Sequence, residues 1–518
     1  MTTHIVWLKR DLRISDHAPL SAVLQHGEPV IVLYVVEPDY WQLPDTSARQ
    51  WRFIRQSLLA LEADLQPRTQ QPTALSVYHG HVIDALQHIQ QHCGDIALYS
   101  HEETGNDWTF QRDRAVKQWC RQHHVRWQEF AQFGVLRPNP SRDHWAKHWQ
   151  QFMSQPRYSI PNCQAVSPLS SLSSVDSLPQ QLGRHFAREA IGQIGGAGNA
   201  WGILNDFLQQ RGEFYRGNIS APQRAQYYCS RLSPYLAYGC LGLRELVQTL
   251  WQAKQEARSA RWQQSLAAVI SRLWWHCHFI QKLEDQPDME WRNLHPAYDE
   301  LRTQTQIEHL LAWQEGRTGW PMVDACMRFL QTQGWLNFRM RALLLSTASY
   351  PLWLPWQAPA HHLARLFIDY EPGIHYPQVQ MQAGTTGINI PRMYNPTRQA
   401  EQFDPDGQFI RQWLPELRQV PTAWIHQPWL LTSKLQQQYG VIIGRDYPAP
   451  LVDFTLAIRH ARAQISALKT PVFRQRAQAI GEQHGSRKGR ASKRIPQRPK
   501  ARRSQRQVHP GQGSLFDD

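Results

Sequence analysis

W-Q-E-G-R-T-G-W-P-M-V-D-A-C-M-R-F-L, from Trp313 to Leu330, opens the stretch that decides the fold of this 518-residue chain. The stretch runs on to Leu417 through G-W-L-N-F-R-M-R (Gly334–Arg341) and I-D-Y-E-P-G (Ile368–Gly373). Apolar residues recur in it at helical spacing, but arginines and tryptophans stand among them. Buried cations need partners, and Trp is buried well only where its indole N–H finds an acceptor. We therefore expect helices arranged around a large, flat, partly anionic ligand.

Short apolar runs alternate with amphipathic helical stretches over residues 1–135. This alternation predicts a doubly wound α/β domain, in which helices cover both faces of a parallel sheet. No G-x-G-x-x-G follows the first expected strand; W-L-K-R-D-L-R (Trp7–Arg13) stands there instead. That loop is either a basic surface loop or a loop that carries chemistry, since such sheets bind ligands at the carboxyl ends of their strands. The expected strands are His4–Lys9, Pro29–Val36, Ala74–His79, Asp95–Ser100 and Val125–Phe130.

The rest of the chain divides into three parts. Residues 136–199 form a connector whose middle is rich in Ser, Pro and Gln, and residues 200–470 predict an all-α domain. Residues 471–518 predict a disordered basic tail, because Arg487 to Arg506 contains ten Lys and Arg. The expected helices of the all-α domain are Leu241–Ala257, Arg261–Leu283, Gln306–Gln314, Met322–Gln331, Phe338–Ser346 and Ala360–Phe367.

Composition limits the compartment and the partners. A net charge of +14 and a pI near 9.6 favour a polyanionic partner. The seven cysteines are odd in number and contain no C-x-x-C pair, so we expect a cytoplasmic protein without a disulfide framework. No apolar run is long enough to cross a membrane, and we expect a monomer. The segment Gln512–Phe516 is an apolar pair on a polar leash, and it resembles the pentapeptide with which bacterial repair proteins bind the sliding clamp.

Two further stretches carry groups that suit a cofactor. Y-C-S-R-L-S-P-Y-L-A-Y-G (Tyr228–Gly239) combines hydroxyls and an Arg just ahead of a helix, which suits a phosphate or pyrophosphate. In S-R-L-W-W-H-C-H-F-I-Q-K-L, Trp275, His278 and Lys282 share one helix face. His276 and His278 are two residues apart and point to different sides, so we expect no metal site.

Taken together, these motifs resemble the photolyase/cryptochrome family from Trp7 to about Pro428. W-L-K-R-D-L-R-I-S-D-H, S-R-L-S-P-Y-L-A-Y-G, W-Q-E-G-R-T-G-W-P-M-V-D-A-C-M-R, R-M-Y-N-P-T-R-Q and F-I-R-Q-W-L-P-E-L carry the resemblance. It implies an N-terminal α/β antenna domain and a C-terminal all-α domain that holds a U-shaped FAD. The implied reaction is light-driven splitting of pyrimidine dimers flipped out of ultraviolet-damaged DNA.

The resemblance also implies roles for single residues. The implied catalytic residues are Arg272, Trp275, Arg339 and His375. Trp275, Arg339, Met381 and Arg392 are implied to contact DNA. Trp356 and Trp313 are implied to carry electrons. The implied cofactor-binding residues are Tyr215, Cys229, Ser230, Arg231, Leu232, Ser233, Arg272, Trp275, His278, Phe338, Arg341, Asp369, Glu371 and His375.

The chain departs from the family pattern around the flavin and the lesion. Arg272 stands where the family has an acidic residue, Phe338 replaces an amide, and His375 replaces the Asn that faces the flavin. The usual W-x-W aligns with Val379 and Met381, so an aromatic wall is missing and the tryptophan relay is cut. Trp356 matches the middle member of that relay. The substitutes open for the other members are Trp313, Trp335, Trp353, Tyr370 and Tyr376.

The sequence leaves more than one possibility open for the antenna chromophore and for the activity. The region that holds a folate in the family reads G-N-D-W-T-F-Q-R-D (Gly105–Asp113), where Trp108 fills the space in one interpretation. A folate, a deazaflavin, a flavin or no second chromophore all remain open. We expect a photolyase, acting on cyclobutane dimers or six-four photoproducts. The alternative is a blue-light receptor without repair activity, which the altered lesion wall and Arg272 favour.

Overall fold

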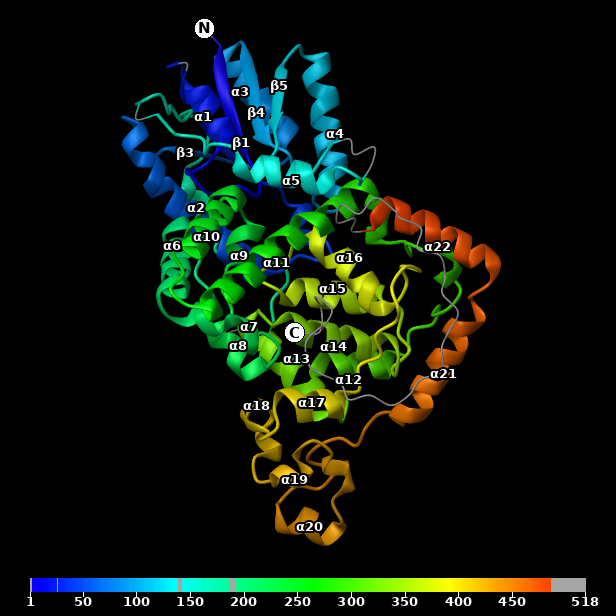
Figure 1. The fold of residues 1–518 in the computed structure, drawn as a ribbon. Helices are drawn as coiled ribbons and strands as arrows, with labels where there is room; N and C mark the ends of the chain where they lie inside the picture. The colour runs from blue at the N-terminus through cyan, green and yellow to red at the C-terminus, as the bar shows by residue number, and fades with distance from the viewer. Residues whose placement is uncertain (1, 26, 138–141, 162, 187–191, 486–518) are drawn as a thin grey trace.

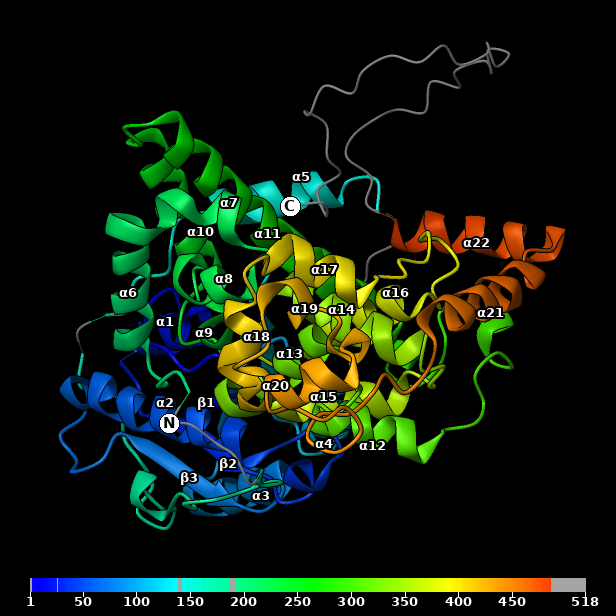
Figure 2. The ribbon, with the colours of Figure 1, turned by 90° about the horizontal axis from the view of Figure 1, so that it is seen from below.

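The computed structural model describes residues 2–25, 27–137, 142–161, 163–186 and 192–485. An α/β domain lies on one end of a larger helical domain, and the C-terminal helices run along one side of the helical domain (Figure 1). The view from below shows the same C-terminal helices projecting at that side (Figure 2). Within the described residues, no helix combines the length and the apolarity needed to span a bilayer.

The α/β domain is doubly wound, as predicted. Its five parallel strands have the order β3-β2-β1-β4-β5. Successive side chains of a strand point to opposite faces, so Ile5 and Trp7 pack with α3 and α4, whereas Val6 and Leu8 pack with α1 and α2. The strands are β1 (Thr3–Leu8), β2 (Val30–Val36), β3 (Leu75–His79), β4 (Ile96–His101) and β5 (Arg126–Phe130). The helices are α1 (Ala18–Leu24), α2 (Ala48–Leu65), α3 (Val82–Cys93) and α4 (Asp107–Gln122).

The loop after β1 joins the two domains. The Arg10 guanidinium donates to the carbonyls of Ala237 at 2.9 Å and Tyr370 at 2.5 Å, both in the helical domain. Arg13 is buried and donates to the carbonyl of Gly239 at 3.0 Å. The interpretation of this segment as a basic surface loop is therefore wrong, because its two arginines satisfy backbone carbonyls inside the interface.

The helical domain contains each helix that the sequence predicts. Proline at the first position starts α13 and α16, and a left-handed glycine ends each of them. The helices that follow the α/β domain are α5 (Trp145–Ser154), α6 (Ala197–Asp206), α7 (Tyr215–Asn218), α8 (Pro222–Tyr228), α9 (Ser233–Ala237), α10 (Leu243–Gln255), α11 (Ala260–Asp285), α12 (Ile307–Glu315), α13 (Pro321–Gln333), α14 (Phe338–Ser349), α15 (Gln357–Leu366), α16 (Pro372–Ala383), α17 (Pro396–Phe403), α18 (Gln408–Trp413), α19 (Thr422–Ile425), α20 (Ser433–Gln438), α21 (Phe454–Ala467) and α22 (Pro471–His484).

Close packing of α11 against α16 sets the position of the site. A Cβ on Gly373, in the first turn of α16, would lie 2.9 Å from the Ile280 Cα of α11. Glycine therefore lets the two backbones approach more closely than any other residue allows. Residues of both helices are brought to one cavity by this contact.

The expected disorder does not begin at residue 471. The α22 helix has its N-cap at Thr470, whose side chain accepts from the Phe473 backbone N–H. Phe473 stacks on His295 with ring centroids 4.0 Å apart, and Ile480 is buried. The prediction of disorder is thus wrong for residues 471–484, because two apolar side chains anchor them. The basic run and Gln512–Phe516 lie outside the described residues.

Candidate functional site

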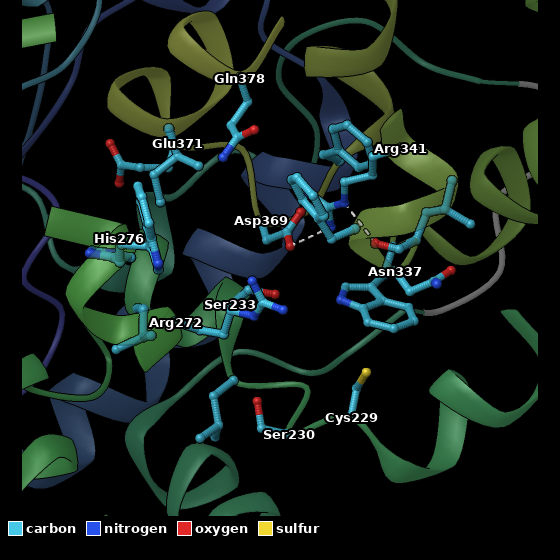
Figure 3. Close-up of a pocket in the computed structure, with 18 of the residues that line it drawn as sticks. Cys229, Ser230, Ser233, Arg272, His276, Asn337, Arg341, Asp369, Glu371 and Gln378 are labelled. Carbon is cyan, nitrogen blue, oxygen red and sulfur yellow. Dashed lines mark hydrogen bonds and ion pairs between the residues drawn. The ribbon is translucent and has the colours of Figure 1, made fainter. Parts of the chain in front are cut away.

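A cavity of about 330 Å³ lies in the helical domain among α9, α11, α14 and α16 (Figure 3). That volume falls in the range of small-molecule and cofactor sites. Its walls are mostly apolar, and polar side chains converge on it from segments far apart in the sequence. The predicted residues that line it are Tyr215, Cys229, Ser230, Arg231, Leu232, Ser233, Arg272, Trp275, Phe338, Arg339, Arg341, Asp369, Glu371 and His375.

One end of the cavity suits an anion. The Arg231 guanidinium lies 4.1 Å from the centre of the Trp335 ring, and its Nε donates to the Gln193 side chain at 3.2 Å. Burial lowers the pKa of Arg231 to about 10, so the group stays charged at neutral pH. Among the described residues no carboxylate forms an ion pair with Arg231. The hydroxyls of Ser230 and Ser233 line the same region, so this end fits phosphate groups.

An ion pair between Arg341 and Asp369 forms another part of the cavity wall. The guanidinium donates to Asp369 Oδ2 and to the Leu336 carbonyl, each at 2.7 Å, and it lies 3.9 Å from the centre of the Phe367 ring (Figure 3). Asp369 Oδ1 is buried and has no hydrogen-bond partner among the described residues. Gln378 also lines the cavity, and its Oε1 is likewise buried without a hydrogen-bond partner among the described residues. Buried acceptors without donors fit a bound molecule that carries N–H or O–H groups.

Glu371 extends this wall and connects it to the α/β domain. The Arg10 guanidinium lies 3.7 Å from the Glu371 carboxyl group. Burial raises the pKa of Glu371 to about 7, although the charge of Arg10 opposes that shift. The Glu371 carboxyl group therefore exchanges a proton near neutral pH and can either donate or accept a hydrogen bond.

His375 is a neutral imidazole held by a backbone carbonyl. Its Nε2 lies 3.0 Å from the Ala360 carbonyl oxygen, which requires the ring proton on Nε2. Burial lowers the pKa of His375 to about 3. The other ring nitrogen, Nδ1, is therefore a hydrogen-bond acceptor, whereas an Asn in its place would also offer a donor.

We expect His375 to keep this tautomer from about pH 5 to about pH 8, unlike an exposed histidine. Because burial disfavours the imidazolium, protonation begins only as the pH falls toward the lowered pKa. Nitrogen NMR of histidine-labelled protein measures the tautomer directly. A titration step of His375 inside that window would contradict the assignment.

The mouth of the cavity is aromatic and cationic. Trp275 lines it from α11, and Phe338, with 38% of its surface exposed, lines it from α14. The Arg339 guanidinium lies 5.5 Å from the centre of the Tyr394 ring and 5.6 Å from the centre of the Phe403 ring. Aromatic faces and a guanidinium suit nucleobases and a phosphate backbone.

Comparisons with known proteins identify this arrangement. A family model described as the FAD binding domain of DNA photolyase matches residues 269–467. A second, described as DNA photolyase, matches residues 4–152, and together the two matches cover more than half of the chain. The chain belongs to the photolyase/cryptochrome family. Its helical domain is the FAD-binding domain of that family, and the cavity is the site whose residues fit FAD.

Individual relatives agree over nearly the whole chain. The deoxyribodipyrimidine photo-lyase of Escherichia coli K12 is 28% identical over 502 residues, covering 90% of this chain and 98% of its own. The cryptochrome DASH of Gloeobacter violaceus is 27% identical over 476 residues, covering 87% of this chain and 93% of its own. A class III photolyase of Agrobacterium tumefaciens shares the fold with a TM-score of 0.77 at 23% identity, covering 90% of this chain and 98% of its own.

Some predicted residues do not reach the cavity. His278 is assigned to the cofactor by the resemblance, but its ring stacks on Trp274 at 5.4 Å and its Nδ1 lies 3.5 Å from Arg142. This placement contradicts the assignment, because His278 faces the neighbouring α5 side of its helix. Met381 and Arg392 also lie outside the cavity lining.

The two tryptophans predicted to carry electrons are buried behind the wall. The Trp356 indole N–H donates to Asn293 Oδ1 at 2.8 Å, and that of Trp313 donates to the Leu344 carbonyl at 3.0 Å. Neither ring lines the cavity, whereas Val379, which aligns with the inner member of the family relay, does. A flavin in the cavity would therefore need another side chain between it and either tryptophan.

Sequence reasoning missed several lining residues. Gln378 and Gln382 follow His375 at helical spacing on α16, so the period of that helix could have identified both. Trp335 lies beside Arg231 because of a chain crossing, and no local pattern predicts that contact.

The structure also gathers Asp11, His17 and His101 at spacing that a metal ion could bridge. His17 Nδ1 accepts from the Leu20 backbone N–H at 3.2 Å, so its proton is on Nε2, which lies 3.1 Å from Asp11 Oδ2. A protonated Nε2 has no lone pair for a metal. The cluster instead fixes the loop after β1, with the His101 ring 2.7 Å from the same Asp11 oxygen.

The region of the family's antenna site is densely charged. The Trp108 ring lies 5.6 Å from Tyr40, and Arg112 stacks 4.7 Å from the Trp7 ring. Arg112 also pairs with Glu37 at 3.0 Å and with Glu103 at 2.7 Å. These contacts describe the surroundings of the expected antenna site and leave its chromophore open.

Proposed function

We propose that this chain is a photolyase, which uses light and FAD to split ultraviolet-induced pyrimidine dimers in DNA. One observation carries the proposal: a single cavity joins a cationic, hydroxyl-lined interior to an aromatic, cationic mouth. A flavin and a flipped-out base need these two environments in contact. The names of the relatives support repair more often than light signalling.

The residues present would divide the work as follows. Reduced FAD, when bound, supplies the electron that splits the dimer. Arg231 and its neighbouring serines would bind the FAD phosphates, and the pair Arg341–Asp369 would orient the ring system. Trp275 would stack on the flipped-out bases, and Arg339 would attract the phosphate backbone. The buried apolar wall excludes water, so charge on the lesion is not lost to competing protonation.

A repair assay tests the proposal. Purified protein is reduced and illuminated with blue light in the presence of oligonucleotides that carry either a cyclobutane dimer or a six-four photoproduct. We expect light-dependent loss of one of the two lesions. Loss of neither, with FAD bound, would contradict repair and favour the light-receptor alternative, for which the absent aromatic wall at Val379 is the supporting observation.

Replacing Trp275 tests the role of the mouth. Trp275→Ala is expected to weaken binding of damaged DNA by about tenfold, because base–aromatic stacking contributes roughly 1–3 kcal/mol per base. Trp291→Ala is the matched control, since Trp291 is 43% exposed and lies outside the cavity lining. Equal affinities of the two variants would remove Trp275 from the binding surface.

We also propose that the protein is a cytoplasmic monomer that binds the sliding clamp through Gln512–Phe516. The support is the sequence of that segment, an apolar pair on a polar leash. Changing Leu515 and Phe516 to Ala in the full-length chain is expected to abolish binding to the clamp of the source organism, measured by surface plasmon resonance. Binding that survives this double change, or its absence in the unchanged protein, would refute the clamp proposal.

A further inference from the structure

Tyr370 lies where the cavity meets a buried hydrogen-bond network. The residue lines the cavity, and only 2% of its surface is exposed. Its hydroxyl donates to Asp45 Oδ2 through a short hydrogen bond. Asp45 comes from the loop before α2, so a carboxyl group of the α/β domain meets a phenol of the helical domain.

Asp45 is the shared acceptor of a buried hydrogen-bond network. Its Oδ2 also lies 3.1 Å from the Asn106 side-chain amide and 3.4 Å from the Tyr376 hydroxyl. Three donors therefore converge on one buried oxygen. A carboxyl oxygen that accepts from a phenol is the natural destination of the phenol's proton, because the hydrogen bond already aligns donor and acceptor.

Tyr215 and Trp356 lack such an acceptor, and Tyr376, which shares Asp45, does not line the cavity. Tyr215 also lines the cavity, but its hydroxyl is hydrogen-bonded to Arg272, whose guanidinium cannot take up a proton. The Trp356 indole N–H meets the neutral amide of Asn293, and Trp356 does not line the cavity. Oxidation of a phenol is much easier when its proton leaves with the electron, so the acceptor distinguishes Tyr370 from Tyr215 and Trp356.

We propose that Tyr370 is a redox-active tyrosine that gives an electron to light-excited, oxidised FAD while its proton passes to Asp45. The O–H bond of Tyr370 breaks and an O–H bond forms on Asp45 Oδ2. The products are a neutral tyrosyl radical, a protonated Asp45 and a flavin reduced by one electron. In the dark the electron and the proton return along the same contacts. The proposal rests on the FAD-binding part of the proposed function and not on lesion repair.

Electron paramagnetic resonance of illuminated, frozen holoprotein tests the proposal. With ring-deuterated tyrosine in the protein, we expect a light-induced radical signal that narrows relative to unlabelled protein. Tyr370→Phe is expected to abolish this signal. The matched control Tyr376→Phe, which removes a second phenol on the same carboxyl group, is expected to retain it.

Infrared difference spectra follow the proton. Illumination is expected to produce a protonated-carboxyl band that is absent from Asp45→Asn, while that variant keeps its FAD absorption and slows radical formation at least tenfold. A signal that narrows only with deuterated tryptophan, or one that survives Tyr370→Phe, would overturn the proposal. Purified protein that is colourless, and so carries no FAD, would also overturn the proposal. A tyrosyl radical in protein that repairs neither lesion would uphold this inference and refute photolyase activity, so the two failures are distinguishable.

Discussion

Arg341→Met is expected to yield protein that no longer retains FAD. The change keeps the apolar stem that packs near Phe367 but removes the charge that pairs with Asp369. The Asp369 side chain is only 3% exposed and its Oδ1 already lacks a partner among the described residues. Leaving such a carboxylate unpaired costs about 3 kcal/mol. The absorbance of flavin in the purified protein and the melting temperature measure the two consequences.

A double variant separates binding from stability. Arg341→Met combined with Asp369→Leu removes both charges, and replacing a buried ion pair by apolar groups is often neutral for stability. We expect the double variant to recover much of the lost melting temperature while its affinity for FAD stays at least a hundredfold below that of the unchanged protein. Retention of FAD by either variant would mean that the pair is not part of the cofactor site.

The fold was accessible from the sequence because its signals are local. Alternating apolar runs predicted the five parallel strands, and Pro321 and Gly334 predicted the borders of α13. The α16 helix was not among the predicted helices. The loop after β1 was not predictable in this way. Arg10 and Arg13 are ordinary basic residues until carbonyls from residues 237–239 and 370 are placed beside them by the tertiary fold.

The site could be predicted from the sequence only where its residues share a local motif. Residues that share a motif, such as Ser230, Arg231 and Ser233, were predicted together and line the cavity together. His278 shares a helix face with Trp275 at i, i+3, but the cavity is lined mainly by the neighbouring face of α11, which carries Arg272, His276 and Phe279, so Trp275 reaches the cavity and His278 does not. The contact between Tyr370 and Asp45 joins residues 325 positions apart, and no periodicity can reveal such a pair.

Gly239→Ala is expected to separate the two domains. Gly239 has a φ of +63°, and a Cβ there would lie 2.2 Å from the Arg10 carbonyl oxygen and 2.5 Å from the Asp11 Cα. The left-handed backbone and the overlap together cost about 3 kcal/mol or more. The overlap falls on backbone atoms, which cannot rotate away as a side chain can. Since Arg10 and Arg13 donate to carbonyls at Ala237 and Gly239, their bonds should be lost as well.

Gly440→Ala isolates the steric part of this effect. Gly440 has nearly the same φ, +65°, but a Cβ on it would meet nothing within 4 Å. We expect this control to lose only about 1 kcal/mol, the cost of a left-handed alanine. Calorimetry and limited proteolysis between the domains compare the two variants. Because α9 ends two residues before Gly239 and lines the cavity, Gly239→Ala should also weaken FAD binding. Equal stability of the two variants would show that the loop after β1 shifts at little cost in free energy and does not hold the domains together.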